Sequence, residues 1–154
     1  MAEMRTAVVK RTSVFPAGAE TVWPLLGQIE MLQYIAKPYA VFTSVDGKTD
    51  WREGETYRLT LKLFGVISLG THEIHVLRGD AQRRSILTQE GNPFVPLWEH
   101  EISLVPCAGG CRYTDSVTLG AGWKTPMIRV WADCFYRHRQ RKWIKFLKKG
   151  EPRI

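Results

Sequence analysis

The chain has 154 residues, 44% hydrophobic and 24% charged, and a formal net charge of +7 that arises from residues 124–154, which hold 10 basic and 2 acidic side chains. This length and composition are typical of one globular domain, here residues 1–154, and exclude a low-complexity chain. No apolar run reaches the roughly 20 residues of a membrane span, and residues 1–10 lack the apolar core of a secretory signal, so we expect a cytoplasmic protein.

The N-terminal part of the chain predicts one strand followed by two short helices. Residues 7–15 are rich in β-branched side chains and end at Pro16, which is typical of a strand. Gly18 is suited to the N-cap of a helix over residues 19–26, although Pro24 removes a backbone donor and should kink or shorten that helix. A second short helix is expected over residues 29–34.

Between residues 39 and 119 the hydrophobic pattern changes to period two. Turn signals such as Asp46-Gly47-Lys48 separate the alternating segments, which are typical of half-buried antiparallel strands. The predicted strands are residues 39–45, 57–63, 70–78, 85–90, 98–104 and 113–119. Residues 123–149 then follow a helical period, which predicts one long C-terminal helix.

Several local motifs occur in the order found in one known superfamily. They are Phe15-Pro16-Ala17 with Glu20, Val22, Trp23 and Leu26, then residues 51–57 (WREGETY), residues 113–115 (YTD) and residues 135–143 (FYRHRQRKW). In these motifs the chain resembles the START-like, or SRPBCC, superfamily, which includes lipid-transfer domains, birch-pollen-allergen-like proteins and polyketide cyclases. The last two motifs resemble those of a bacterial subgroup without a settled activity.

The resemblance implies an α+β helix-grip fold rather than one activity. In that fold a seven-stranded curved antiparallel sheet surrounds a long C-terminal helix, and two short helices lie between strands 1 and 2. A cavity is expected between the sheet and the long helix.

Strand parity places several polar side chains on the same faces as apolar ones. If Ile74, Ile102 and Val117 face inward, residues two positions away along each strand face inward as well. The polar and aromatic residues on these faces are His72, Trp98, His100, Tyr113 and Asp115. His138 on the long helix follows Phe135 by three residues and is also expected to point inward.

Three interpretations of this cluster remain open. It is a sealed network that stabilises the sheet, a polar end that orients a ligand in an apolar pocket, or an acid–base site. For the acid–base site, the catalytic candidates are His72, His100 and Asp115. No motif names a reaction, because a nucleophile elbow and a phosphate-binding glycine loop are both absent from the sequence.

Our leading hypothesis is the binding of a hydrophobic small molecule, lipid-, polyketide- or aromatic-like, in an internal cavity with a polar end. The residues expected to line it are Tyr57, Leu59, Leu61, His72, Ile74, Trp98, His100, Ile102, Tyr113, Asp115, Val117, Trp131, Phe135 and His138. One alternative is a cyclase-, dehydratase- or hydrolase-like enzyme that uses a pocket histidine as general base. The other is an interaction protein that works through the basic helix end.

We predict no cofactor and no metal. His72 and His75 face opposite sides of a strand and cannot share an ion, and His72, His100 and Asp115 could hold one only if the strands bring them together. Cys107 and Cys111 flank a hairpin loop and are interpreted as free loop cysteines, with a disulfide across the hairpin as the alternative. The basic residues at the helix end are Arg137, Arg139, Arg141, Lys142, Lys145, Lys148 and Lys149. We interpret them as a solvated face near the negative end of the helix dipole, with weak contact to an anionic surface as the alternative and no specific nucleic-acid partner.

Overall fold

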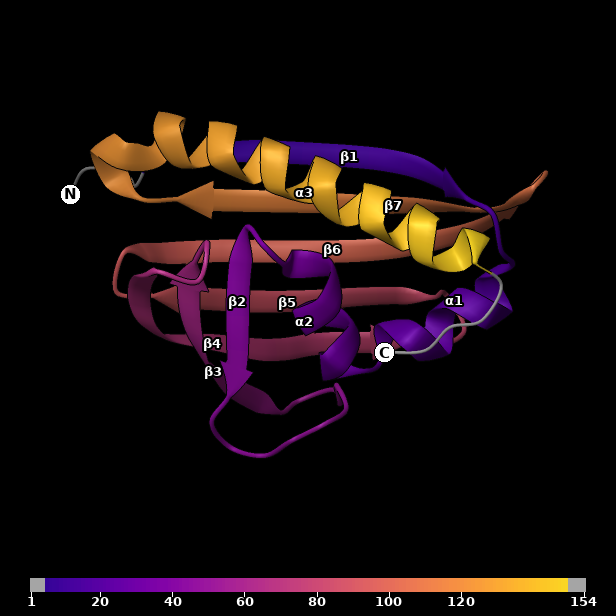
Figure 1. The fold of residues 1–154 in the computed structure, drawn as a ribbon, viewed down its shortest axis with the longest axis horizontal. Coiled ribbons are helices and arrows are strands. Elements are labelled where there is room, and N and C mark those ends of the chain that lie inside the picture. Colours follow the sequence, from indigo (N-terminus) through magenta and orange to yellow (C-terminus); the bar gives the residue numbers. More distant parts are fainter. Residues whose placement is uncertain (1–4, 150–154) are drawn as a thin grey trace.

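The computed structural model describes residues 5–149, which form one sheet, three α-helices and a short 3-10 turn (Figure 1). The elements in chain order are β1 (Ala7–Phe15), α1 (Ala19–Leu26), α2 (Ile29–Ala36), β2 (Ala40–Ser44), β3 (Thr56–Leu63), β4 (Ile67–Asp80), β5 (Ser85–Asn92), β6 (Val95–Cys107), β7 (Gly110–Gly120), η1 (Gly122–Lys124) and α3 (Thr125–Lys148).

The sheet places the first strand beside the last. Its strand order is β1-β7-β6-β5-β4-β3-β2, and every neighbouring pair is antiparallel. Register shifts interrupt the β3–β4, β4–β5 and β5–β6 pairings, and irregularities of this kind bend the strands. This architecture confirms the α+β helix-grip fold predicted from the sequence.

The predicted elements differ from the observed ones mainly at their ends. The second helix continues to Ala36, and the long helix begins at Thr125 after a 3-10 turn rather than at residue 123. Thr125 causes this later start, because its hydroxyl donates to the carbonyl oxygen of Gly122 and accepts from the backbone N–H of Ala121. None of the helices within residues 5–149 is long and apolar enough to cross a membrane.

The long helix α3 runs along β1 and β7 and reaches α2 near its C-terminal end (Figure 1). Arg11 on β1 forms two hydrogen bonds to Asp133, at 3.0 and 2.9 Å. At the other end, Lys142 Nζ donates to the carbonyl oxygen of Tyr34 at 2.6 Å, at the last turn of α2. These contacts hold α3 over one face of the sheet.

The basic end of α3 is not one uniform face. Arg137, Arg141, Lys145, Lys148 and Lys149 are exposed, as expected of solvated cations. Arg139, by contrast, is only 5% exposed. The expectation of a solvated side chain is therefore wrong for Arg139, because it lies one turn beyond Phe135 on the buried stripe of the helix.

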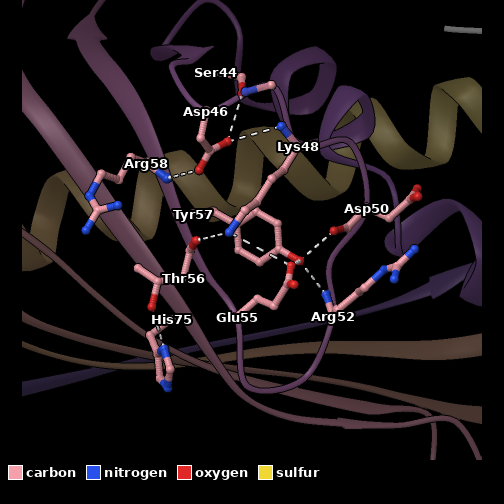
Figure 2. Close-up of polar contacts among 11 residues, drawn as sticks. Ser44, Asp46, Lys48, Asp50, Arg52, Glu55, Thr56, Tyr57, Arg58 and His75 are labelled. Carbon is pink, nitrogen blue, oxygen red and sulfur yellow. Dashed lines mark hydrogen bonds and ion pairs between the residues drawn. The ribbon is translucent and has the colours of Figure 1, made fainter.

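The segment between β2 and β3, residues 45–55, is fixed by two side chains (Figure 2). Asp46 accepts hydrogen bonds from the backbone N–H groups of Lys48 and Arg58, at 3.1 and 3.0 Å. The Tyr57 hydroxyl donates to the carbonyl oxygen of Asp50 at 2.6 Å and accepts from the backbone N–H of Arg52 at 2.6 Å. This segment also pairs with the α1–α2 junction, where Gln28 forms a bridge to Asp50.

Gly110, the first residue of β7, lies against the end of β1 with a φ of +146°. A Cβ added there would overlap the carbonyl oxygen of Phe15 and lie 2.8 Å from the backbone nitrogen of Ala17. Neighbouring Gly109 has a φ of +87° but open space around it. Comparing substitutions at the two glycines therefore distinguishes the cost of backbone strain from that of steric overlap.

We expect Gly110→Ala to lower the free energy of unfolding by about 3 kcal/mol or more, because strain and overlap act together. The matched control Gly109→Ala should cost about 1–2 kcal/mol, from the left-handed backbone alone. Urea unfolding followed by circular dichroism measures both values. Equal losses for the two variants would contradict the close approach of β7 to the β1 end.

Candidate functional site

An internal cavity of about 290 Å³ lies between the sheet and the helices α2 and α3. Its wall is largely aliphatic and aromatic, with Phe42 and Leu61 from the sheet and Trp131 and Phe135 from α3. Polar side chains interrupt this wall. One is Gln28, and the others, called the polar patch here, are His72, Thr88, Glu90, Asn92, His100 and Arg139.

Asp115 on β7 is the hub of a buried network behind this patch. Its Oδ1 lies 2.6 Å from His100 Nε2 on β6 and accepts a hydrogen bond of 3.0 Å from the Tyr113 hydroxyl. Its Oδ2 accepts one of 3.0 Å from Gln140 Nε2 on α3. Gln140 also donates to the carbonyl oxygen of Arg11 on β1 at 2.9 Å. One carboxylate, 1% exposed, thus joins β6, β7 and α3, and through Gln140 reaches β1.

Glu90 on β5 links the two histidines across the cavity wall. Its Oε1 lies 2.8 Å from His72 Nε2, and its Oε2 lies 3.8 Å from His100 Nδ1. The Thr88 hydroxyl donates to Oε2 at 2.7 Å. The other ring nitrogen of His72 lies 3.1 Å from Asn92 Nδ2. Both nitrogens of each imidazole are therefore turned toward a polar neighbour.

The network fixes the charge of its members. Burial raises the pKa of Asp115 and of Glu90, but contacts with the histidines lower both. For Asp115 the charge of Arg139 and the hydrogen bond from Gln140 lower it further, and both pKa values lie below the usual range. Burial lowers the pKa of His100, whereas Asp115 and Glu90 raise it, and the net shift is upward. His100 is therefore stabilised as an imidazolium between two carboxylates.

Two phenols complete the interior around His100. Tyr136 on α3 accepts a hydrogen bond of 3.1 Å from Trp98 Nε1, and its ring lies 5.0 Å from the His100 ring. Burial is the main cause of the raised pKa of Tyr136 and of Tyr113, with the charge of Asp115 contributing to both. Both phenols consequently stay protonated and remain hydrogen-bond donors at neutral pH.

The structure places eight of the fourteen predicted site residues in the cavity wall. They are Leu61, His72, Ile74, Trp98, His100, Ile102, Trp131 and Phe135. They come from β3, β4, β6 and α3, and the period-two pattern correctly assigned the strand members to the inner face.

The other six predicted site residues do not line the cavity. They are Tyr57, Leu59, Tyr113, Asp115, Val117 and His138. Tyr57 turns its hydroxyl to the 45–55 segment, and Asp115 is covered by Gln140. His138 points away from the cavity, because its Nε2 contacts the carbonyl oxygen of Lys37 and its ring stacks on Tyr39.

Sequence reasoning missed Glu90 and Arg139 as members of the polar patch. Both residues follow periodic patterns that can be seen in the sequence. Glu90 shares strand parity with Ile86 and Thr88 on β5. Arg139 continues a series at every fourth position of α3, namely Trp131, Phe135, Arg139 and Trp143, and all four line the cavity.

No metal-binding arrangement of three or more His, Cys, Asp or Glu side chains occurs within the part of the chain that the structure describes. His72 and His100 instead bind separate oxygens of the Glu90–Asp115 network. Cys107 and Cys111 are free thiols on either side of the β6–β7 turn.

No protein-family model matches the sequence, and no curated protein matches it either. Solved structures do share the fold. A START superfamily protein from Mycobacterium smegmatis superposes with a TM-score of 0.71 at 17% identity, over 94% of this chain and 99% of its own. Norcoclaurine synthase from Thalictrum flavum, in complex with dopamine and hydroxybenzaldehyde, superposes with a TM-score of 0.71 at 13% identity, over 97% of this chain and 91% of its own. Major latex-like protein 151 from Panax ginseng superposes with a TM-score of 0.67 at 10% identity, over 89% of this chain and 94% of its own. The START-like resemblance is thereby confirmed for the fold, and at these identities the likeness carries no activity to this chain.

The buried network predicts a stability that depends on pH in both directions. Asp115 and Glu90 have lowered pKa values, so their contribution is present above the usual carboxyl pKa and is lost as pH falls through the folded values. His100 has a raised pKa, so its contribution is complete below the usual histidine pKa and is lost as pH rises through the folded value. The contribution is therefore largest between about pH 4 and 6.5.

We expect Asp115→Asn to lower the free energy of unfolding by about 3–5 kcal/mol in that window, because a buried pair loses one charged partner. The difference from wild type should shrink at lower and higher pH. The control Asp133→Asn removes an ion pair whose side chains are 29% and 43% exposed, and should cost about 1 kcal/mol or less. Urea titrations from acidic to alkaline pH measure this, and a pH-independent difference for Asp115→Asn would refute the charged network.

Proposed function

We propose that the protein binds a hydrophobic small molecule inside this cavity, with the polar patch orienting the ligand. The observation that carries the proposal is the cavity itself, a space of about 290 Å³ between the sheet and the helices α2 and α3. Protein interiors are normally packed without voids of this size. Its volume lies near the lower end of the range for ligand pockets, roughly 300–1,000 Å³.

The chemistry of the wall supports an apolar ligand body. Phe42, Leu61, Trp131 and Phe135 offer carbon surface from both the sheet and α3. Each square ångström of apolar surface that a ligand removes from water here contributes about 25 cal/mol. The neighbouring fold of norcoclaurine synthase, which holds dopamine and hydroxybenzaldehyde, supports the idea that a helix-grip interior accommodates small aromatic molecules.

The enzyme alternative requires a histidine with an unoccupied basic nitrogen. His100 lies between Asp115 and Glu90 with a raised pKa, and His72 contacts Glu90 and Asn92 through its two nitrogens. A cyclase-, dehydratase- or hydrolase-like reaction with either residue as general base would have to break one of these contacts first. The arrangement therefore favours recognition over proton abstraction.

The remaining expectations from the sequence stay predictions. These are the single domain over residues 1–154, the cytoplasmic location, and the weak anionic-surface contact of the basic helix end. The last of them involves the exposed cations Arg141, Lys145 and Lys148, because Lys142 is already bound to the α2 end.

We expect Leu61→Trp to abolish binding of the neutral fluorescent probe N-phenyl-1-naphthylamine, because the larger side chain fills the cavity. The matched control is Leu77→Trp, at a leucine that is 42% exposed on the same sheet. It should bind the probe as the wild type does. Probe fluorescence titration gives the affinities, and native mass spectrometry of freshly purified protein identifies any co-purified molecule.

Overpacking a core costs about 1–3 kcal/mol, so circular dichroism must show that Leu61→Trp is folded. Leu61→Phe serves as a milder variant, for which we expect weaker binding than wild type. Unchanged probe affinity in both folded variants would show that the cavity is not the binding site, and no binding by the wild type would reject the proposed function.

A further inference from the structure

Arg139 lines the cavity with a guanidinium that forms no hydrogen bond or ion pair with the residues that the structure describes. The residue is 5% exposed, and its Nε is buried without a hydrogen-bond partner. It forms no ion pair with any carboxylate among residues 5–149, since Asp115 and Glu90 are bound to histidines instead. Its neighbours are aromatic faces, with the guanidinium carbon 5.0 Å from the Tyr136 ring centre and 5.5 Å from that of Phe135.

Two further hydrogen-bond donors on the same helix are also buried without an acceptor. The indole N–H groups of Trp131 and Trp143 are buried without a hydrogen-bond partner, and both side chains line the cavity. Indole nitrogen and guanidinium are donors only and cannot satisfy one another. The α3 side of the cavity therefore offers unsatisfied donors and no matching acceptor.

An unpaired buried charge is strongly unfavourable, which makes the missing partner informative. Cation–π contact with Tyr136 and Phe135, together with the nearby charges of Asp115 and Glu90, offsets part of the cost of burying the guanidinium. It leaves the in-plane N–H groups of Arg139 without acceptors, because aromatic faces accept from above the ring only. A planar carboxylate matches these N–H groups in geometry and in charge.

We propose that the ligand is an amphipathic acid whose carboxylate pairs with Arg139, while its apolar part lies against Leu61, Phe42 and Trp131. This inference rests on the proposed function and adds the chemical class of the ligand. It assigns Arg139 as the specificity-determining residue, and it places His72, Glu90 and His100 as a neighbouring patch whose polar atoms already contact one another. A neutral carbonyl or hydroxyl group would satisfy the donors but leave the charge unpaired.

The test compares two ligands that differ only at the head group. Bound N-phenyl-1-naphthylamine is displaced from the wild-type protein by decanoate or by 1-decanol at neutral pH. Both compounds are used below the concentrations at which they aggregate. We expect decanoate to displace the probe at a concentration at least about tenfold lower than 1-decanol does, as a charge-assisted pair predicts.

The variant Arg139→Met should remove this preference. We expect the decanoate concentration needed for displacement to rise at least about tenfold, with little change for 1-decanol or for the probe itself. Arg139→Lys should restore part of the preference, because it keeps the charge but not the planar fork. Arg141→Met is the matched control, since it removes an exposed cation two residues away and should leave both ligands unaffected.

A structural role for Arg139 would give a different result. Replacing an unpaired buried charge by an apolar side chain is expected to leave thermal stability unchanged or raised, whereas loss of a structural contact would lower it. Equal displacement by decanoate and 1-decanol, or an unchanged preference in Arg139→Met, overturns the acid assignment while leaving the cavity as a binding site. Failure of the wild type to bind the probe, together with no heat of decanoate binding in calorimetry, rejects the binding function and the acid assignment together.

Discussion

The hydrogen bonds to Asp115 set the rotation of α3, and most other features of the interior depend on that rotation. Gln140 donates to Asp115 on β7 and to the carbonyl oxygen of Arg11 on β1, which fixes one side of the helix against these strands. Adjacent residues of an α-helix point about 100° apart. With Gln140 directed at β7, Arg139 is turned toward the cavity instead of toward solvent. The same carboxylate that stabilises the sheet thus determines which charge faces a ligand.

The interior contains two kinds of charge with different roles. Glu90 and Asp115 each contact His100 directly, which suits a network that holds strands and helix together. Arg139 lies beside them yet pairs with none of them. The carboxylates and His100 thus find their polar partners within the fold, whereas the Arg139 guanidinium is left for a ligand to bind. The START-like fold alone does not predict this difference.

Sequence patterns predicted the sheet and the long helix because both follow from hydrophobic periodicity. Period two placed His72, His100 and Ile102 on the inner face, where they are found. It could not place Asp115 correctly relative to the cavity, because whether an inward residue is open or covered depends on the helix above it. Arg139 escapes prediction for a related reason. Its neighbours in sequence are basic, which is typical of a solvated face, although Arg139 follows Phe135 by four residues.

The pairing of β1 with β7 has a consequence for how the chain acquires its structure. Ala7 lies opposite Leu119, and the Ser13 hydroxyl donates a hydrogen bond to Gln140 Oε1 on the helix that follows β7. During synthesis β1 therefore has no partner until the ribosome has also made β7. Contacts of such large separation slow folding, because loop closure must precede any gain from pairing. Until then the nascent chain exposes an unpaired strand edge, and such an edge is prone to pair with other chains and aggregate.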